Sequence, residues 1–322
     1  MSTVSTSGAK NPACAILGLI ILAALVVFPW FSGPFVLHLA VLTAINIIVV
    51  NGLALISRSG QLSLGHAAFM AVGAYVAVIL GQRFGLPFFL TSVVGIIASM
   101  VVALVLGWII LRLRGVYFVL VTFAFGELVR LVLLDFTDIT GGANGITSIA
   151  AAEIFGFKFD SRASMYALCA AVALLTTWML KRLFNRPIGH AIDSVAVNPA
   201  LAESTGLSVH RLQVFSFVIG CGLAGLGSVL QAHYIGYISP ETYNTSISVG
   251  LIVMLVIGGR NSVWGPLVGA IVLTPLPELF RGAVQTQHIF YGAALILILR
   301  FLPGGLSSLP GVLRKLTGKE AA

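Results

Sequence analysis

The sequence predicts an all-α fold: a polytopic membrane bundle of about ten transmembrane helices with both termini in the cytoplasm. Hydrophobic residues make up 58% of the 322 residues, charged residues make up 9%, and the mean hydropathy is +1.06. This composition is typical of membrane proteins. Apolar runs recur along the chain, and lysine and arginine concentrate in alternate connections between them. The length of the runs and the position of the charges give the number of crossings and their direction.

Most of the apolar runs approach the roughly 20 residues that a helix needs to cross the hydrocarbon core. They lie near residues 13–31, 35–56, 62–80, 89–111, 115–135, 164–183, 212–234, 246–259, 263–280 and 287–302. The first run lacks a small-residue cleavage site behind it, so we expect an uncleaved anchor. The eighth is short, so it is expected to begin earlier, to cross at a thin place or to be partly unwound. A transmembrane domain over 13–305 is therefore predicted, with cytoplasmic tails at 1–12 and 306–322.

The distribution of basic residues sets the orientation, because short cytoplasmic loops keep an excess of lysine and arginine. With the N-terminus inside, thirteen of the eighteen basic residues fall in the cytoplasm. The other five are Arg83, Arg130, Lys158, Arg162 and Arg281. Two connections are long: 136–163 is predicted outside and 184–211 in the cytoplasm. The basic residues form no patch or aromatic-interleaved stripe, which excludes nucleic acid as a partner.

The third segment opens with polar groups and glycines, "GQLSLGHAAF", which is unusual for a membrane helix. We place Gln61 and Ser63 at its cytoplasmic end, where water or buried protein can satisfy them. Small residues then recur at helical spacing, a pattern that lets helices pack closely in lipid. They are Gly65, Ala68, Ala71 and Ala74. Helix packing is the favoured role for this stretch, with lining of a transport pathway as the alternative; Gln61, Ser63, Gly65 and His66 are its candidate residues.

Glu127 and Arg130 lie three residues apart on the fifth segment and can form one ion pair on one helical face. A charge in lipid is costly unless it is paired or wet. A structural pair is therefore favoured. The alternative is that one of the two meets a zwitterionic substrate near the outer mouth.

The long cytoplasmic connection is predicted to form two short helices. Apolar residues recur at helical spacing at Ile188, Ala191, Ile192 and Val195. Asn198 and Pro199 then supply a cap and a first helical residue, and Gly206 ends the second helix. The connection carries few cations, which disfavours a lipid-binding surface helix. We expect a docking surface for a soluble partner, lined by Ile192 and Val195.

Two familiar chemistries are excluded by the sequence. "GCGLAG", from Gly220 to Gly225, matches the dinucleotide-binding pattern, but that pattern requires a preceding strand and this one lies inside an apolar helix. Close helix packing explains these glycines. The chain contains no Gly-x-x-x-x-Gly-Lys-Ser/Thr loop for ATP. It also lacks the clustered acidic and histidine residues that a proton-driven carrier needs within its segments.

Four motifs occur in the order typical of one family: "SGQLSLGHAAFMAVGAY", "LRGVYFVLVTFAFGELVRL", "TGGANGI" and "ALAESTG". The chain resembles the LivM-type inner-membrane permeases of branched-chain amino acid ABC transporters, over about residues 45–305. The resemblance implies a multi-pass importer subunit in a bacterial inner membrane. It implies as partners a second, LivH-type permease, two cytoplasmic P-loop ATPases and a periplasmic or extracellular substrate-binding protein, besides membrane lipid. No cofactor is expected on this chain, and ATP and Mg²⁺ are expected on the ATPases.

The same resemblance assigns coupling to the ATPases to residues 188–206. The candidate coupling residues are Ile188, Gly189, Ile192, Val195, Ala202, Glu203 and Gly206. The family carries several Arg and Glu residues in this loop, where this chain has His190, Asp193, Ser194 and Asn198, which disfavours coupling by salt bridges. In the outer motif, Gly141, Gly142 and Gly145 are expected to supply unusual backbone angles around Asn144.

The resemblance implies transport of branched-chain or other hydrophobic amino acids. Related permeases serve urea, short amides and aromatic acids, and a mostly apolar channel does not choose among these substrates. Two other classes compete with an ABC permease. They are a stand-alone secondary transporter built on broken helices and a structural membrane subunit of an energy-converting complex.

Overall fold

The computed structural model describes residues 33–113, 115–154, 156–260, 262–279 and 292. Within these ranges seven stretches are long and apolar enough to cross a membrane. They are α2 (Pro34–Arg58), α3 (His66–Phe84), α4 (Phe88–Ile110), α5 (Val116–Asp135), α7 (Arg162–Phe184), α10 (Val209–Ile235) and Pro240–Gly258. A polytopic helical membrane protein is confirmed. The predicted segments at 13–31 and 287–302 lie outside the described residues, so the count of ten stays a prediction.

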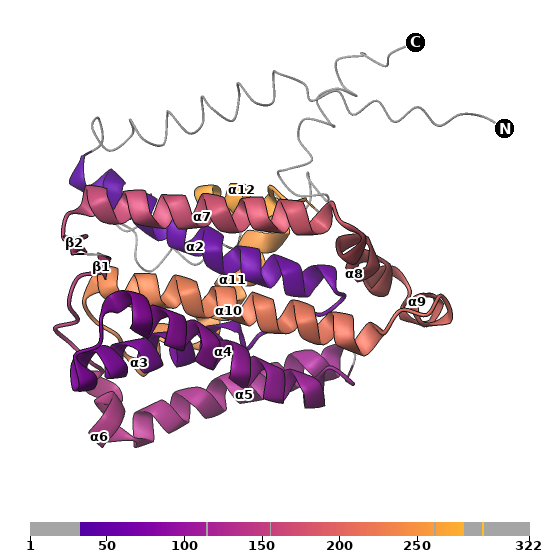
Figure 1. The fold of residues 1–322 in the computed structure, drawn as a ribbon, viewed down its shortest axis with the longest axis horizontal. Helices are drawn as coiled ribbons and strands as arrows, with labels where there is room; N and C mark the ends of the chain where they lie inside the picture. The colour runs from indigo at the N-terminus through magenta and orange to yellow at the C-terminus, as the bar shows by residue number, and fades with distance from the viewer. Residues whose placement is uncertain (1–32, 114, 155, 261, 280–291, 293–322) are drawn as a thin grey trace, which may run out of the picture.

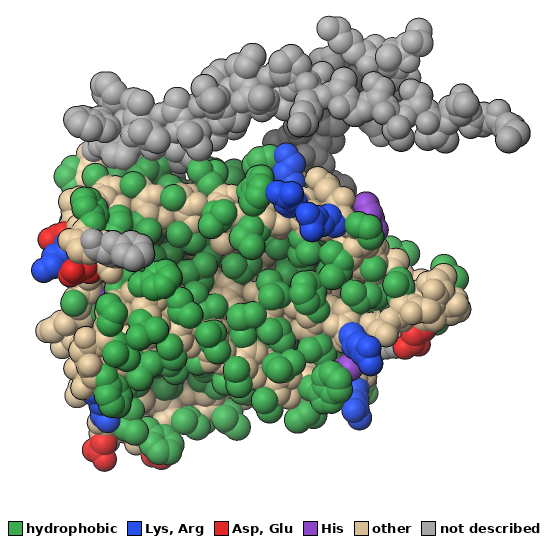
Figure 2. Space-filling view, viewed as in Figure 1, with side chains coloured by type: hydrophobic (Ala, Val, Ile, Leu, Met, Phe, Trp, Pro, Cys, Tyr) green, Lys and Arg blue, Asp and Glu red, His purple; other side chains and the backbone are tan. Residues whose placement is uncertain are grey.

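The long helices lie side by side, and successive ones run in opposite directions along the bundle (Figure 1). α2 is central: it packs against α7 and α10 and against two later helices, α11 (Thr245–Gly258) and α12 (Gly265–Leu273). α10 in turn packs against α3 and α4. The flank seen in Figure 2 is covered by hydrophobic side chains, and charged side chains gather toward the two ends. This is the surface expected of helices that face lipid along their length.

Close contacts between glycines set the helix crossings at the centre. A methyl group added to Gly52 of α2 would lie 2.3 Å from the carbonyl oxygen of Gly220 in α10. One added to Gly73 of α3 would lie 2.6 Å from the Cα of Gly225. The glycines of "GCGLAG" therefore lie inside α10 and let backbones touch, which confirms the packing interpretation.

α5 lies at the edge of the bundle. Only two of its residues, Phe118 and Thr122, are buried, and it contacts mainly α3 and the 3₁₀ turn η2 (Pro240–Tyr243). Phe118 packs edge-on against Phe217 of α10, with ring centroids 6.0 Å apart. The opposite side of α5 is exposed in the isolated chain, with Leu120, Leu128 and Leu131 among its exposed apolar residues.

Two predicted helix boundaries were wrong. The third segment becomes helical at His66 rather than at residue 62, and Gln61 to Gly65 run as irregular backbone. The ninth predicted segment, 263–280, is two short helices, α12 and α13 (Leu276–Leu279), rather than one span. Pro275 lies between them, and a proline has no backbone N–H to continue the helical hydrogen bonds.

α11 and α12 form a tight hairpin. A methyl group on Gly258 would lie 1.9 Å from the carbonyl oxygen of Gly265, and one on Gly269 would lie 1.9 Å from that of Met254. The two backbones therefore touch along the hairpin. Arg260, in the connection, donates from Nη2 to the carbonyl oxygen of Ser57 at 2.7 Å, which ties the hairpin to the end of α2.

The predicted outer connection folds into small elements at one end of the bundle (Figure 1). They are α6 (Thr137–Thr140), η1 (Gly142–Asn144), and an antiparallel hairpin of β1 (Glu153–Ile154) and β2 (Phe157–Lys158). The predicted cytoplasmic connection forms α8 (Pro187–Val197) and α9 (Pro199–Ser204) at the opposite end. The two long connections are therefore on opposite ends of the bundle.

Candidate coupling and pathway sites

The α8–α9 hairpin has the local structure that the sequence predicts. Asn198 caps α9, its Oδ1 accepting from the backbone N–H of Leu201 at 3.1 Å, and Pro199 follows as the first helical residue. Gly206 follows α9 with φ +86°, a conformation that glycine adopts at low cost. These three features fix where α9 begins and ends.

The packing of the hairpin differs from the prediction for its apolar residues Ile192 and Val195. Ile192 and Val195 are fully buried: Ile192 packs with Leu55 and Phe184, and Val195 packs with Ala202. The prediction that Ile192 and Val195 line the docking face was wrong, because helical spacing gives an apolar face without saying which neighbour covers it. They hold the hairpin against the bundle instead.

The open side of the hairpin carries other apolar residues. Val197 is 87% exposed, Leu201 63% and Ile188 37%, and Glu203 is also exposed. Gly189 faces α7 instead, and a methyl group there would lie 2.4 Å from the Cα of Phe184. The hairpin thus has a bundle side with Gly189 and an open side with Val197 and Leu201.

An ion pair connects α8 to the end of α2. Arg58 donates from Nε to Oδ1 of Asp193 at 2.8 Å and from Nη2 to Oδ2, so the pair is bidentate. The guanidinium carbon also lies 3.8 Å from the ring centroid of Phe184. Bidentate charge-assisted pairs are the stronger and more directional ones. Sequence reasoning used Arg58 only as a topology charge, and nothing local links it to Asp193, 135 positions later.

The chain that follows Arg58 is also attached to the hairpin. Gly60 has φ +88°, and a methyl group there would lie 3.2 Å from the Cα of Ala196 in α8. Gln213 of α10 donates to the carbonyl oxygen of Ser59 at 3.4 Å. The end of α2 is therefore where α8, α10 and the α11–α12 hairpin meet.

The irregular stretch from Gly60 to Gly65 runs into the bundle before α3 begins. Gln61 and Ser63 are buried, and Gln61 donates to the carbonyl oxygen of Leu113 at 3.5 Å, so its amide contacts protein. A ring nitrogen of His66 lies 3.2 Å from the carbonyl oxygen of Val49. Val49 is nine residues, about 13 Å of helix, inward from Arg58. α3 therefore begins well inside the bundle.

Polar groups from two other helices satisfy the backbone at this start. The N–H of Leu64 donates to Oγ1 of Thr122 in α5 at 3.1 Å, and that of Ala67 to Oγ of Ser248 in α11 at 3.0 Å. Gly65 lets α5 approach, since a methyl group there would lie 2.5 Å from the carbonyl oxygen of Thr122. Small residues of α3, including Ala68, are buried. These contacts support the packing interpretation, and a pathway role stays a prediction.

Glu127 and Arg130 form the predicted pair, with Nε of Arg130 2.9 Å from Oε2 of Glu127. Two partners were missed. Arg130 also donates from Nη1 to Glu241 in η2 at 2.7 Å, and Oγ1 of Thr245 donates to Glu127 at 2.7 Å. The side chains of Arg130, Glu127 and Glu241 are 24%, 31% and 60% exposed. We call these four residues the α5 charge cluster; it joins the exposed edge helix to η2 and α11.

The outer motif makes the backbone turns that its glycines predict. Gly141, Gly142 and Gly145 have φ of 76°, 55° and 69°, with Asn144 in η1 between them. A methyl group on Gly145 would lie 2.1 Å from the carbonyl oxygen of Ile238, which is bridged to Ile146. The motif therefore attaches the outer connection to the chain just before η2. Within the described ranges, no three His, Cys, Asp or Glu side chains lie close enough to hold a metal ion.

Comparisons with known proteins agree with this architecture. The family described as "Branched-chain amino acid transport system / permease component" matches residues 35–299. The high-affinity branched-chain amino acid transport system permease protein LivM of Escherichia coli is 30% identical over 315 residues, covering 90% of this chain and 74% of that relative. LivM of Salmonella typhimurium is 30% identical over 305 residues, covering 87% of this chain and 72% of its own. A probable LivH permease of Methanocaldococcus jannaschii is 25% identical over 249 residues, covering 73% and 77%. No solved structure matches the chain.

Proposed function

The chain belongs to the family of branched-chain amino acid transport permeases, and from this premise we propose that it moves branched-chain or other hydrophobic amino acids across a bacterial inner membrane. It is a permease subunit of an ABC importer. The observation that carries the assignment is the family match over 35–299, which spans the described bundle from α2 onward. We further propose that it pairs with a LivH-type permease and receives substrate from a separate binding protein. In this proposal two cytoplasmic ATPases bind ATP and Mg²⁺ and hydrolyse the ATP.

The α5 charge cluster supports a transport pathway that passes this face of α5. Two of its side chains, Glu127 and Arg130, lie on a mostly apolar helix at the edge of the bundle, and charges exposed to lipid are costly. We therefore place this face of α5 against water or the second permease rather than lipid. One guanidinium and two carboxylates match the carboxylate and ammonium of a free amino acid. A zwitterion passing this point would exchange partners with the cluster.

The α8–α9 hairpin supports a route for coupling. An ATPase that docks on the open side, at Val197 and Leu201, moves α8 through a buried and hydrogen-bonded contact. The Arg58–Asp193 pair and the Gly60–Ala196 contact pass that movement to the end of α2 and to the Gly60–Gly65 stretch. That stretch leads directly into α3, so the start of α3 inside the bundle is where we expect movement to reach the pathway.

Uptake of labelled leucine tests the assigned function. A strain that lacks this chain is expected to lose high-affinity leucine uptake, and the plasmid-borne chain is expected to restore it. Competition with unlabelled valine, phenylalanine, urea, a short amide and an aromatic acid identifies the substrate class. Competition by urea or the amide but not by valine would contradict the amino acid assignment.

Co-purification with the ATPases tests the docking side. Val197→Asp and Leu201→Asp are each expected to weaken ATPase association by about tenfold, about 1.4 kcal/mol. Phe157→Asp is the matched control, because Phe157 is a similarly exposed apolar residue at the opposite end, 61% exposed in β2. Unchanged association in both α8–α9 variants would place the docking surface elsewhere.

A further inference from the structure

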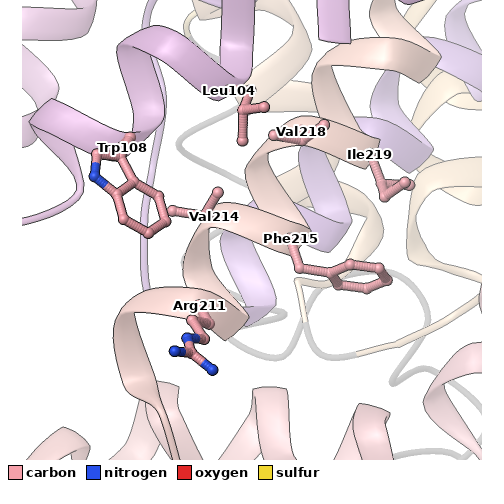
Figure 3. Close-up of a pocket in the computed structure, with 7 residues that line it drawn as sticks. All are labelled: Leu104, Trp108, Arg211, Val214, Phe215, Val218 and Ile219. Atoms are coloured by element: carbon pink, nitrogen blue, oxygen red, sulfur yellow. The ribbon is translucent and has the colours of Figure 1, made fainter. Parts of the chain in front are cut away.

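A narrow groove runs between α4 and α10 at the end of the bundle that also carries α8. Its volume is about 270 Å³. Figure 3 shows Leu104 and Trp108 on one helix facing a row of residues on the other, with Arg211 at one end of the row. The lining residues are Leu104, Trp108, Arg211, Val214, Phe215, Val218 and Ile219. The groove is thus apolar along its length and basic at one end.

The basic end has no neutralising partner among the residues that the structure describes. Arg211 is exposed, and none of the ion pairs among the described residues includes it. It lies in the first turn of α10, which contains no acidic residue. A cation at a helix N-terminus adds to the positive end of the helix dipole, so an anion placed there is favoured. Arg112, also exposed, follows the end of α4 and adds a further positive charge at this level.

The aromatic wall of the groove is held in place. Trp108 is 49% exposed, and its ring packs edge-on against His210 with centroids 5.0 Å apart. Tryptophan is enriched where membrane meets water, because its ring is apolar and its N–H is polar. Trp108 therefore marks the interface, with Arg211 on its water side and Val218 and Ile219 further along the groove.

α4 itself indicates what lies beside the groove. It carries no charged residue from Phe88 to Ile110, and apolar side chains are exposed along its length, among them Val93, Ile97, Val101, Leu104 and Val105. This contrasts with α5, which carries the charge cluster. We infer that α4 faces lipid and not a protein partner.

We propose that the groove binds one anionic phospholipid. Its phosphate lies at Arg211, and an acyl chain lies in the groove between Trp108 and Phe215. Basic pockets between transmembrane helices on the cytoplasmic side bind anionic headgroups in this way. The site belongs to this chain alone and does not depend on the transported substrate.

Fluorescence quenching of Trp108 tests the site in the full-length chain. Trp30, Trp178 and Trp264 are replaced by phenylalanine, and the chain is placed in nanodiscs with brominated phosphatidylglycerol or brominated phosphatidylcholine. Half-quenching is expected at about fivefold less phosphatidylglycerol than phosphatidylcholine, the effect of one basic residue near an anionic headgroup. Arg211→Gln is expected to abolish the preference, and Arg211→Lys to keep it. Arg186→Gln, a basic residue just before α8, is the matched control and is expected to change nothing.

Three results would overturn the proposal. Equal quenching by the two lipids would show a groove that does not select anions. A preference that survives Arg211→Gln would place the headgroup elsewhere. Loss of quenching when the ATPases are added would show that a protein partner covers the groove.

Discussion

Arg58 connects the end of α2 to the α8–α9 hairpin. It contacts Asp193 through two hydrogen bonds and lies over the ring of Phe184. Its side chain is only 14% exposed, so the pair is screened less than a surface pair. The pair joins the end of α2 to α8, so in the coupling route proposed above it is a positioning contact.

Neutralising each of these two charges, and then exchanging them, tests the contact. Asp193→Asn and Arg58→Gln are each expected to lower leucine uptake and binding-protein-stimulated ATP hydrolysis by about tenfold, the effect of losing about 1.4 kcal/mol of coupling. Membrane abundance should stay near normal. The double variant Arg58→Asp with Asp193→Arg should recover part of both activities, and Asp160→Asn, an exposed residue at the opposite end, should change neither. Full activity in all single variants would show that the pair is dispensable.

A second test at this scale concerns Glu127. Its partner Arg130 retains Glu241 when Glu127 is changed, and exposed pairs contribute about 1 kcal/mol or less. Glu127→Gln is therefore expected to keep normal abundance and thermal stability while lowering uptake by about tenfold. Glu153→Gln, which removes an exposed carboxylate 4.0 Å from Lys158, is the control. Normal uptake in Glu127→Gln would leave the cluster with only a structural role.

The residues that sequence reasoning found are those whose partners lie nearby in the chain. Asn198 caps α9 through a hydrogen bond to Leu201, three residues later in the chain, and Arg130 pairs with Glu127 at the same sequence separation. Arg58 with Asp193 and Arg130 with Glu241 are separated by 135 and 111 positions. Nothing in composition or periodicity identifies such partners, because they depend on which helices pack together.

At the scale of elements, hydropathy predicted the long helices well and their interruptions poorly. α4 and α5 begin and end within about one residue of the predicted bounds. The start of α3 was missed because Leu62 and Leu64 keep the average high while the backbone is irregular. The irregular backbone and the first turn of α3 are stabilised by Thr122 and Ser248, on two other helices, which accept the N–H groups of Leu64 and Ala67. Sequence periodicity does not contain that information.

The seating of α8 against α7 gives a prediction at this scale. Gly189→Ala places a methyl group 2.4 Å from the Cα of Phe184, so α8 must shift away from α7. We expect the transporter to assemble with normal abundance, but ATP hydrolysis should no longer respond to ligand-loaded binding protein. Gly250→Ala is the matched control, because a methyl group there meets nothing within 4 Å. A coupled Gly189→Ala variant would show that this contact is not needed.

For the whole molecule, the charge distribution predicts that the two long connections lie on opposite sides of the membrane. The structure places them at opposite ends of the bundle, and the side that each end faces is testable. With the native cysteines replaced, cysteines introduced at Ala143 and Ser194 are expected to react with a membrane-impermeant maleimide from opposite sides, Ala143 from outside. Labelling of both from one side would overturn this topology.

The length of α12 has a consequence for how the protein is made. At nine residues it spans about 14 Å, roughly half of the hydrocarbon thickness, and α11 spans about 21 Å. If a helix this short moved from the translocon into the bilayer without a partner helix, its terminal N–H and carbonyl groups would lie unpaired in the hydrocarbon core. α12 packs on α2, which is synthesised long before it. Stable integration of the α11–α12 hairpin therefore requires α2 to be in the membrane already. Membrane insertion of the C-terminal half thus depends on the N-terminal half.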